Sequence, residues 1–367
     1  MKIVQILPEL NAGGVERGTL EIAAHLVREG HQAIVISNGG RLVRALEQSG
    51  VRHHQLPVHR KSPATLLQVR PLRRFLAQER PDILHIRSRV PGWVAWLAWR
   101  GMDPATRPRL VTTVHGFYSV NAYSAIMTQG ERVIAVSESV RRYVLENYPR
   151  CDGKIIRVIP RGIDPATDNP DFRPTAEWSA RWRLERADLL GKCVLLLPGR
   201  ITRLKGHEDF CALIAALKDA GIPVHGLIAG DTHEKKRAYL EELRGLVQTL
   251  GIAGEITFLG HRQDIREVMA VSDLVCALSQ QPESFGRTVL EAMALGKPVV
   301  GYACGGVAEL LDRLFPAGRV PLGNRSRLVE VARAVIRDRP RPLAVGAPFT
   351  LDAMCRATSA VYQELAR

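Results

Sequence analysis

Two basic residues in the second half of the chain lie where a phosphate group could bind. Arg200 and Lys205 occur in the run Pro198–Gly206, directly after the apolar residues 193–198, which we expect to form a strand. Ligands of open α/β sheets bind at the carboxyl ends of the strands, so both cations are expected at that edge. Both cations suit a diphosphate leaving group, whose negative charge grows as its bond to the rest of the substrate breaks. A solvated surface loop is the alternative, but the adjoining strand and glycine favour a functional site.

Two glutamates, Glu283 and Glu291, stand eight residues apart further along. Between them, Ser284, Phe285 and Gly286 lead into a predicted helix whose first N–H groups are available to phosphate oxygens. We expect Glu291 about two turns inside this helix, where its carboxylate is a suitable partner for a ribose diol. Glu283 is expected beside a bound hexose. A solvated helix face is the alternative, and the apolar, glycine-rich context argues against it.

The first half offers two further candidates. Gly13 and Gly14 follow a strand-like segment and precede a predicted helix, so backbone N–H groups there can approach a diphosphate or, in the alternative, merely form a tight turn. The pattern is not the G-x-G-x-x-G of nicotinamide or flavin sites. His115 ends another strand-like segment and is followed by Gly116, and we favour a sugar contact over a purely structural role for its ring.

The sequence predicts neither a metal site nor a bound cofactor. It contains no Asp-x-Asp pair of the kind that holds a divalent ion on a nucleotide sugar. Its six cysteines are scattered without a C-x-x-C, which fits reduced thiols better than zinc ligands or disulfides. We therefore expect protein cations to stabilise the departing diphosphate.

Short apolar segments alternate with amphipathic ones in both halves of the chain. This pattern predicts an α/β protein with two doubly wound, Rossmann-like domains facing a cleft. The expected divisions are an N-terminal acceptor-binding domain at 1–165, a C-terminal nucleotide-sugar-binding domain at 166–350, and a final helix at 351–367 that packs back on the first domain. Residues 165–186, rich in proline, aspartate and arginine, are interpreted as the interdomain connection.

Most of the net charge of +14 belongs to the first half, because residues 1–165 contain 24 Lys and Arg but only 13 Asp and Glu. An anionic membrane, a phosphorylated acceptor or nucleic acid would be attracted to it. Five cations at 60–74 accompany apolar residues on a predicted helix: Arg60, Lys61, Arg70, Arg73 and Arg74 among Leu66, Leu67, Val69, Leu72, Phe75 and Leu76. This mixture suits an anionic leaflet, although a helix packed on the sheet with its arginines in water fits nearly as well.

No apolar run reaches the ~20 residues that a membrane-spanning helix needs. The first residues run directly into a strand-like segment without the apolar core of a signal peptide. We expect a cytoplasmic enzyme, peripheral on the inner face of the plasma membrane if the basic segment binds lipid.

Taken together, these motifs resemble the family 4 retaining glycosyltransferases of GT-B fold, over nearly the whole chain. The motifs are, in order, GGVER at 13–17, HG at 115–116 with the aromatic residues after it, VSES at 136–139, RGID at 161–164, GR-x4-KG at 199–206, the two glutamates, and GGVAEL at 305–310. The chain departs from the family at Arg161-Gly162, where members commonly have Asn-Gly. The stretch after His115 is most similar to members that build bacterial lipopolysaccharide core.

The resemblance implies transfer of a sugar, with retained configuration, from a nucleotide-sugar donor to a glycan or lipid-linked acceptor. The implied catalytic residues are His115, Glu283, Arg200 and Lys205. The implied donor-binding residues are Gly13, Gly14, Arg200, Lys205, Glu283, Ser284, Phe285, Gly286 and Glu291. Contacts to the base are expected from the backbone at 260–262. The alternatives are a nucleotide-sugar 2-epimerase of the same architecture and, less favoured because no binding module is recognisable, a nucleic-acid-binding protein.

Overall fold

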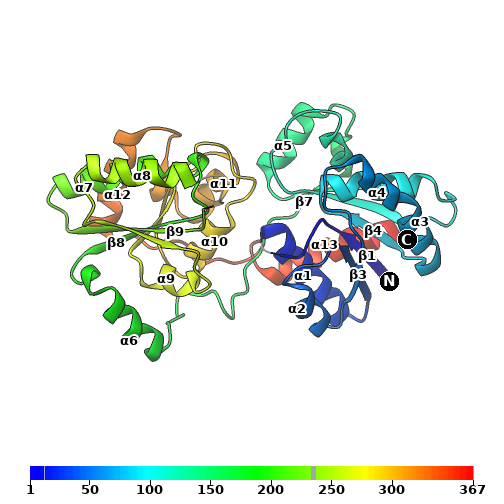
Figure 1. Ribbon diagram of the computed structural model, residues 1–367, viewed down its shortest axis with the longest axis horizontal. Helices are drawn as coiled ribbons and strands as arrows, with labels where there is room; N and C mark the ends of the chain where they lie inside the picture. The colour runs from blue at the N-terminus through cyan, green and yellow to red at the C-terminus, as the bar shows by residue number, and fades with distance from the viewer. Residues whose placement is uncertain (12, 233–236, 367) are drawn as a thin grey trace. The chain divides into compact units, whose positions relative to one another are not determined.

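A computed structural model of the chain describes residues 1–11, 13–232 and 237–366. The chain forms two compact units (Figure 1). The first contains residues 1–162 together with 348–367, and the second contains residues 163–347. Each unit is an α/β structure built on its own parallel sheet, as the alternation of apolar and amphipathic segments predicts.

The sheet of the first unit has seven strands in the order β3-β2-β1-β4-β5-β6-β7. All neighbouring strands are parallel. The strands are β1 (Lys2–Ile6), β2 (Gln32–Ser37), β3 (Arg52–Gln55), β4 (Ile83–Ile86), β5 (Arg109–Val114), β6 (Arg132–Ala135) and β7 (Ile156–Val158). The central strands are buried throughout because helices cover both faces, which explains their continuous apolar sequences.

The helices of the first unit form two layers. They are α1 (Gly14–Arg28), α2 (Val43–Gln48), α3 (Val69–Glu79), α4 (Arg89–Arg100), α5 (Glu138–Asn147) and α13 (Leu351–Ala366), with the 3₁₀ helices η1 (Pro63–Gln68), η2 (Ser124–Thr128) and η3 (Gly153–Ile155). In Figure 1, α1, α2 and the C-terminal α13 gather on one side of the sheet, and α3 and α4 lie on the other. Met354, Val361 and Tyr362 of α13 join the core of this unit. The Tyr362 hydroxyl lies 2.6 Å from Nδ1 of the buried His85 on β4.

The sheet of the second unit has six parallel strands in the order β10-β9-β8-β11-β12-β13. The strands are β8 (Cys193–Pro198), β9 (Val224–Ala229), β10 (Ile256–Gly260), β11 (Leu274–Ala277), β12 (Val299–Tyr302) and β13 (Arg319–Val320). The chain adds β9 and β10 on one side of the central strand β8, and then returns to add β11, β12 and β13 on its other side. This is the doubly wound pattern that places binding loops at the carboxyl ends of the central strands.

Helices also cover both faces of the second sheet. They are α6 (Ala176–Glu185), α7 (His207–Asp219), α8 (Arg237–Thr249), α9 (Ile265–Val271), α10 (Arg287–Ala294), α11 (Gly305–Leu314) and α12 (Arg325–Asp338), with η4 (Ala187–Leu189), η5 (Arg203–Lys205) and η7 (Pro316–Gly318). Figure 1 shows α7, α8 and α12 along one side of β8 and β9, and α9 on the other. The layers therefore follow the alternation of the sequence.

The stretch at 165–186 is not a simple connection. The first unit ends at Gly162, and α6 belongs to the second unit. Trp178 and Trp182, one helical turn apart, are buried and stack with ring centroids 5.1 Å apart. The indole of Trp178 donates a hydrogen bond of 2.7 Å to Asp264. The sequence interpretation missed this helix because its composition is mostly polar. Its buried side consists of the two tryptophans.

The basic segment at 60–74 is divided between two helices. It forms η1 and then the start of α3, with Pro63 and Pro71 in the first turns of these two helices. Leu72 and Leu76 are fully buried, and Phe75 stacks on His54, so these side chains face the body of the unit. The apolar side chains that remain exposed are Leu66 and Leu67, at 48% and 74%.

Within the described part of the chain, no helix is both long enough and apolar enough to cross a membrane. Among the same residues, no three His, Cys, Asp or Glu side chains are grouped as metal ligands. All six cysteines are free.

Candidate functional site

Three neighbouring strands of the second unit, β8, β11 and β12, deliver the loops that carry most of the predicted site residues. The loop after β8 packs against the loop after β11 at Gly206. A Cβ on this residue would lie 2.0 Å from the carbonyl oxygen of Leu278, and its φ of +71° also favours glycine. The Gln280 N–H donates to the Leu204 carbonyl at 2.8 Å. These contacts fix the two loops against each other.

Lys205 and Glu283 meet where the two loops touch. The Lys205 ammonium lies 2.6 Å from Glu283 Oε1, and the Ser279 hydroxyl donates to the same oxygen. Both charged side chains are partly exposed, at 31% and 24%. The pair is therefore oriented by its own loops while it remains reachable from solvent. A cation and a carboxylate in this position can bind an anionic group and a hydroxyl side by side.

Arg200 lies on the same loop as Lys205 and is exposed. Among the described residues, its side chain makes no hydrogen bond or ion pair, so its donors point to no protein partner. Arginine presents a fork of N–H donors that matches phosphate oxygens in a bidentate manner. Of the three cations in this loop, Arg203 pairs with Glu208 and Glu242, Lys205 pairs with Glu283, and Arg200 has no partner among the described residues.

The backbone of Glu283 is held from the other side by the glycine pair that begins α11. The Gly306 N–H donates to the Glu283 carbonyl at 2.7 Å, and Glu283 forms a parallel bridge with Gly305. A Cβ on Gly305 would lie 2.3 Å from that carbonyl oxygen, which explains glycine at this position. Phe285 is buried against this junction, and Ser284 lies between it and Glu283.

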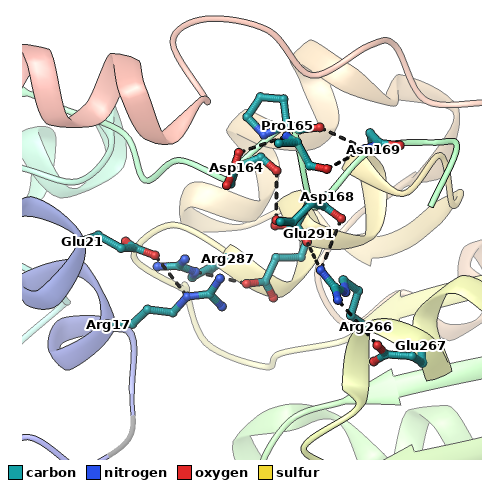
Figure 2. Close-up of polar contacts among 12 residues, drawn as sticks. Arg17, Glu21, Asp164, Pro165, Asp168, Asn169, Arg266, Glu267, Arg287 and Glu291 are labelled. Carbon is teal, nitrogen blue, oxygen red and sulfur yellow. Dashed lines mark hydrogen bonds and ion pairs between the residues drawn. The ribbon is translucent and has the colours of Figure 1, made fainter. Parts of the chain in front are cut away.

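Glu291 lies closer to the helix start than the sequence interpretation placed it. Gly286 is the N-cap of α10, which begins at Arg287, so Glu291 is about one turn inside and not two. Its Oε1 is 3.2 Å from Nε of Arg287, one turn earlier (Figure 2). The two side chains are 17% and 15% exposed. Arg287 thus compensates the charge of the carboxylate that was expected to bind a ribose diol.

Asp209 is a positioning residue that the sequence interpretation missed. It lies in the first turn of α7, is only 4% exposed, and accepts three hydrogen bonds. The donors are Gln280 Nε2 at 2.7 Å, the Tyr302 hydroxyl at 2.5 Å and Arg325 Nε at 2.5 Å. Asp209 therefore ties the start of α7 to the loop after β11 and to the end of β12. Its position three residues after Gly206 was visible in the sequence, but its partners were not.

The candidates of the first unit also lie at the carboxyl ends of its strands. Gly13 is the N-cap of α1, with φ of +151°, and Gly14 begins the helix. A Cβ on Gly14 would meet no heavy atom within 4 Å, so the start of α1 borders open space. The Glu16 carboxylate of the first turn lies beside Gly13, within 2.5 Å of where a Cβ would be, so the positive end of α1 already faces a carboxylate of its own chain.

His115 follows β5 and contacts Arg161, which follows β7. The Arg161 guanidinium donates to Nδ1 of the imidazole, and the backbone N–H of His115 donates to the Tyr118 hydroxyl at 3.1 Å. Burial, and then the charges of Arg161 and Arg87, hold the pKa of His115 well below its usual value. Imidazole Nε2 is buried and has no hydrogen-bond partner among the described residues.

Comparisons with known proteins agree with this architecture. Residues 12–167 match the family model described as Glycosyltransferase Family 4, and residues 182–346 match Glycosyl transferases group 1. A D-inositol 3-phosphate glycosyltransferase of Mycobacterium marinum is 30% identical over 81% of this chain and 67% of its own length. The lipopolysaccharide core biosynthesis mannosyltransferase LpsB of Rhizobium meliloti is 31% identical over 57% of this chain and 61% of its own length.

Solved structures match over the whole chain. A glycosyltransferase from Rickettsia africae superposes with a TM-score of 0.83 at 28% identity, covering 100% of this chain and 98% of that one. HepE of Anabaena, solved with UDP and glucose, has a TM-score of 0.76 at 22% identity, covering 100% and 95%.

The fold and the ordered motifs thus define a glycosyltransferase of GT-B architecture. The chain belongs to glycosyltransferase family 4, within the group 1 glycosyl transferases, and is a hexosyltransferase of that family.

The first prediction concerns the cations of the loop after β8. Lys205→Ala and Arg200→Ala should each raise the barrier to sugar transfer by roughly 2–4 kcal/mol, because a preorganised charge at the leaving group is lost. The measurement is kcat/KM with a verified donor. Lys218→Ala is the matched control, since Lys218 lies on α7 and pairs with Glu255 near the surface. Unchanged turnover in both loop variants contradicts the assignment.

The second prediction concerns Glu291. Glu291→Ala should weaken nucleotide binding, because the ribose hydroxyls lose an ionised acceptor and Arg287 loses its partner. Glu291→Gln should be less harmful, since it keeps an oxygen in place. Calorimetric titration with the donor nucleotide measures both. Should the alanine variant bind as tightly as the wild type, Glu291 serves only to pair with Arg287.

Proposed function

We propose that this enzyme transfers a hexose from a nucleotide-sugar donor to a glycan or lipid-linked acceptor, with retention of the anomeric configuration. The observation that carries the proposal is the 2.6 Å ion pair between Lys205 and Glu283, on a loop that also carries Arg200, whose side chain has no partner in the described part of the chain. This arrangement provides two cations for a diphosphate and a carboxylate for sugar hydroxyls. The structure of HepE with UDP and glucose supports a nucleotide sugar as the ligand class.

The leaving group determines the first part of the mechanism. When the glycosidic bond of the donor breaks, the diphosphate gains negative charge on its terminal oxygens. Arg200 and Lys205 stabilise that charge, and the positive end of the α10 dipole adds to their effect. These groups supply what a divalent ion would supply, so we propose that transfer requires no metal.

The ion pairs of the two carboxylates bear on the route by which retention is achieved. Glu283 is bound through one oxygen to both Lys205 and Ser279, and Glu291 is bound to Arg287. Neither carboxylate is placed as a free nucleophile for a covalent sugar intermediate. We therefore propose substitution on the front face of the sugar, in which the departing phosphate accepts the proton of the acceptor hydroxyl.

The acceptor belongs to cell-surface glycan synthesis in this proposal, with lipopolysaccharide core as the favoured case. LpsB, which is 31% identical over 57% of this chain, is named for that pathway. The named relatives are all transferases, so the 2-epimerase alternative gains no support from them. The same relatives give no reason to retain the nucleic-acid-binding alternative.

The third prediction tests the reaction itself. Thermal-shift screening of UDP-, GDP-, ADP- and CMP-sugars identifies the donor, because a ligand that binds only the folded protein raises Tm. Transfer from that donor to a lipopolysaccharide-core acceptor should then continue in EDTA, and NMR of the product should show the donor's anomeric configuration. Loss of activity in EDTA with recovery in Mg²⁺ or Mn²⁺ contradicts metal independence. Release of a 2-epimerised sugar without acceptor supports the epimerase instead.

We also propose that the first unit binds an anionic membrane surface, which places the enzyme on the inner face of the plasma membrane. The surface, here called the η1 patch, consists of exposed Leu66 and Leu67 with Arg60, Lys61, Arg70 and Arg74. Arg73 is excluded because its guanidinium packs against Gly101. Two adjacent exposed leucines beside four cations provide both parts of an interfacial contact, insertion of apolar side chains and attraction to lipid headgroups.

The fourth prediction follows from the η1 patch. Replacing its four cations by Gln should abolish co-sedimentation with vesicles containing anionic lipid, since each cation contributes up to about 1 kcal/mol near such a surface. The control replaces four exposed arginines of the second unit, Arg181, Arg183, Arg244 and Arg333, which changes the net charge equally. Binding by the wild type should weaken as salt increases. Equal binding by both variants removes the patch from membrane contact without affecting the transferase assignment.

A further inference from the structure

Arg161 and His115 form a buried polar pair at the carboxyl edge of the first sheet. Arg161 is 8% exposed, and it occupies the position after β7 where the family commonly has asparagine. Arg87, which follows β4, is 1% exposed and lies close by. A Cβ on Gly18 of α1 would lie 2.9 Å from one guanidinium nitrogen of Arg161 and 3.4 Å from one of Arg87. The glycine therefore leaves room for both arginines beneath the helix.

The contact between Arg161 and His115 determines which ring nitrogen carries the proton. All nitrogen-bound hydrogens of a guanidinium are donors, and arginine has no acceptor. Because Arg161 Nη2 contacts imidazole Nδ1, this ring nitrogen must be the acceptor and cannot be protonated. In the neutral ring the proton is then on Nε2. The partner that orients an imidazole is known to fix its tautomer in this way.

The surroundings of the ring favour the neutral form. Two guanidiniums, those of Arg161 and Arg87, lie near it, and the nearby His85 is occupied by the Tyr362 and Thr113 hydroxyls. Positive charges oppose protonation of the imidazole. Nε2 is therefore a buried N–H donor without an acceptor among the described residues. A buried donor of this kind requires a ligand or water oxygen as its partner.

We propose that Arg161 is a positioning residue that holds His115 as the neutral tautomer protonated on Nε2, so that His115 donates a hydrogen bond to a substrate oxygen and does not act as a base. This inference rests on the proposed function, in which His115 contacts the transferred sugar or its phosphate. The oxygen it binds is a hydroxyl or phosphate oxygen, since both accept hydrogen bonds. The arginine in place of the usual asparagine thus has a specific task in this chain.

The tautomer can be measured without any substrate. In the intact protein labelled with ¹⁵N-histidine, the long-range couplings of the ring show which nitrogen is protonated, and His115→Gln identifies the signal. We expect Nε2 to be protonated and Nδ1 to be bare between pH 6 and 8. Arg161→Met, which has no donor, should give a mixture of tautomers, whereas Arg161→Lys, which keeps a donor, should preserve the wild-type pattern. Arg157→Met is the matched control, because Arg157 lies on β7 and pairs with Glu364 at the surface.

Kinetics test the link to catalysis. Arg161→Met should lower kcat/KM about tenfold or more, and Arg161→Lys should restore part of the loss. His115→Gln places an amide N–H near the position of Nε2, whereas His115→Asn places it near Nδ1. We therefore expect the glutamine variant to be at least about tenfold more active than the asparagine variant, a difference comparable to one well-placed donor.

The outcomes separate the positioning role from the proposed function. A wild-type ring protonated on Nδ1, or an Arg161→Met spectrum identical to the wild type, overturns the inference even if the enzyme is a transferase. Equal activity of the glutamine and asparagine variants at His115 also overturns it. The expected spectra in a protein that transfers no sugar from any donor would support the tautomer assignment and contradict the proposed function. If Arg161→Met does not fold, the wild-type spectrum and the activities of the two His115 variants still test whether Nε2 carries the proton.

Discussion

The close packing of the loop after β8 on the loop after β11 is the constraint on which the donor site depends. Gly206 has no room for a side chain, because the Leu278 carbonyl lies where its Cβ would be. This contact brings Lys205 within 2.6 Å of Glu283, although 78 residues separate them in the sequence. A larger residue at 206 would separate the loops, and the ion pair would open. The positions of the charges therefore follow from a steric condition on the backbone.

The same principle applies at the other side of Glu283. The Glu283 backbone packs closely on Gly305 and Gly306 at the start of α11, where a side chain on Gly305 would collide with it. The Gly306 N–H donates a hydrogen bond to the Glu283 carbonyl. Asp209 then connects α7 to the loop after β11, to β12 and to α12 through one donor from each. The site is thus positioned on rigid strand ends by backbone contacts and one buried carboxylate. Such support keeps charged groups in place before a ligand arrives, which is what electrostatic stabilisation of a leaving group requires.

The fold could be predicted from the sequence because it follows from periodicity. Apolar segments of strand length alternate with amphipathic segments throughout, and parallel sheets covered on both faces are the structure this pattern specifies. The prediction was wrong where a few residues outweigh composition. In α6, Trp178 and Trp182 provide a buried side within a polar stretch. For the basic segment at 60–74 the sequence left two interpretations open, and the burial of Leu72 and Leu76 in α3 favours a packed helix for those two side chains.

The candidate site was predictable in its residue types but not in its pairings. Motif order identified Lys205 and Glu283, but only the three-dimensional contact shows that they bind each other. The Arg287–Glu291 pair could have been inferred from its i, i+4 spacing, and the helix start at Arg287 places Glu291 one turn inside. Arg161 was visible as a departure from the family motif, yet nothing in the sequence connects it with His115, 46 residues earlier. Residues that act through another side chain leave no local pattern, so they are the part of a site that sequence reasoning misses most readily.

The pairings also describe what must change when a donor binds. Each glutamate of the candidate site is compensated by a neighbouring cation, Glu283 by Lys205 and Glu291 by Arg287. A diphosphate competes for Lys205, and the sugar and ribose hydroxyls then become donors to the carboxylates. Because these ion pairs are partly exposed, little free energy is lost when they are exchanged for ligand contacts. In the first unit the situation is reversed, since His115 Nε2 is buried without a hydrogen-bond partner among the described residues and need not be released from any of them. The charges of the second unit are thus exchangeable, whereas the His115 ring of the first unit is held by Arg161.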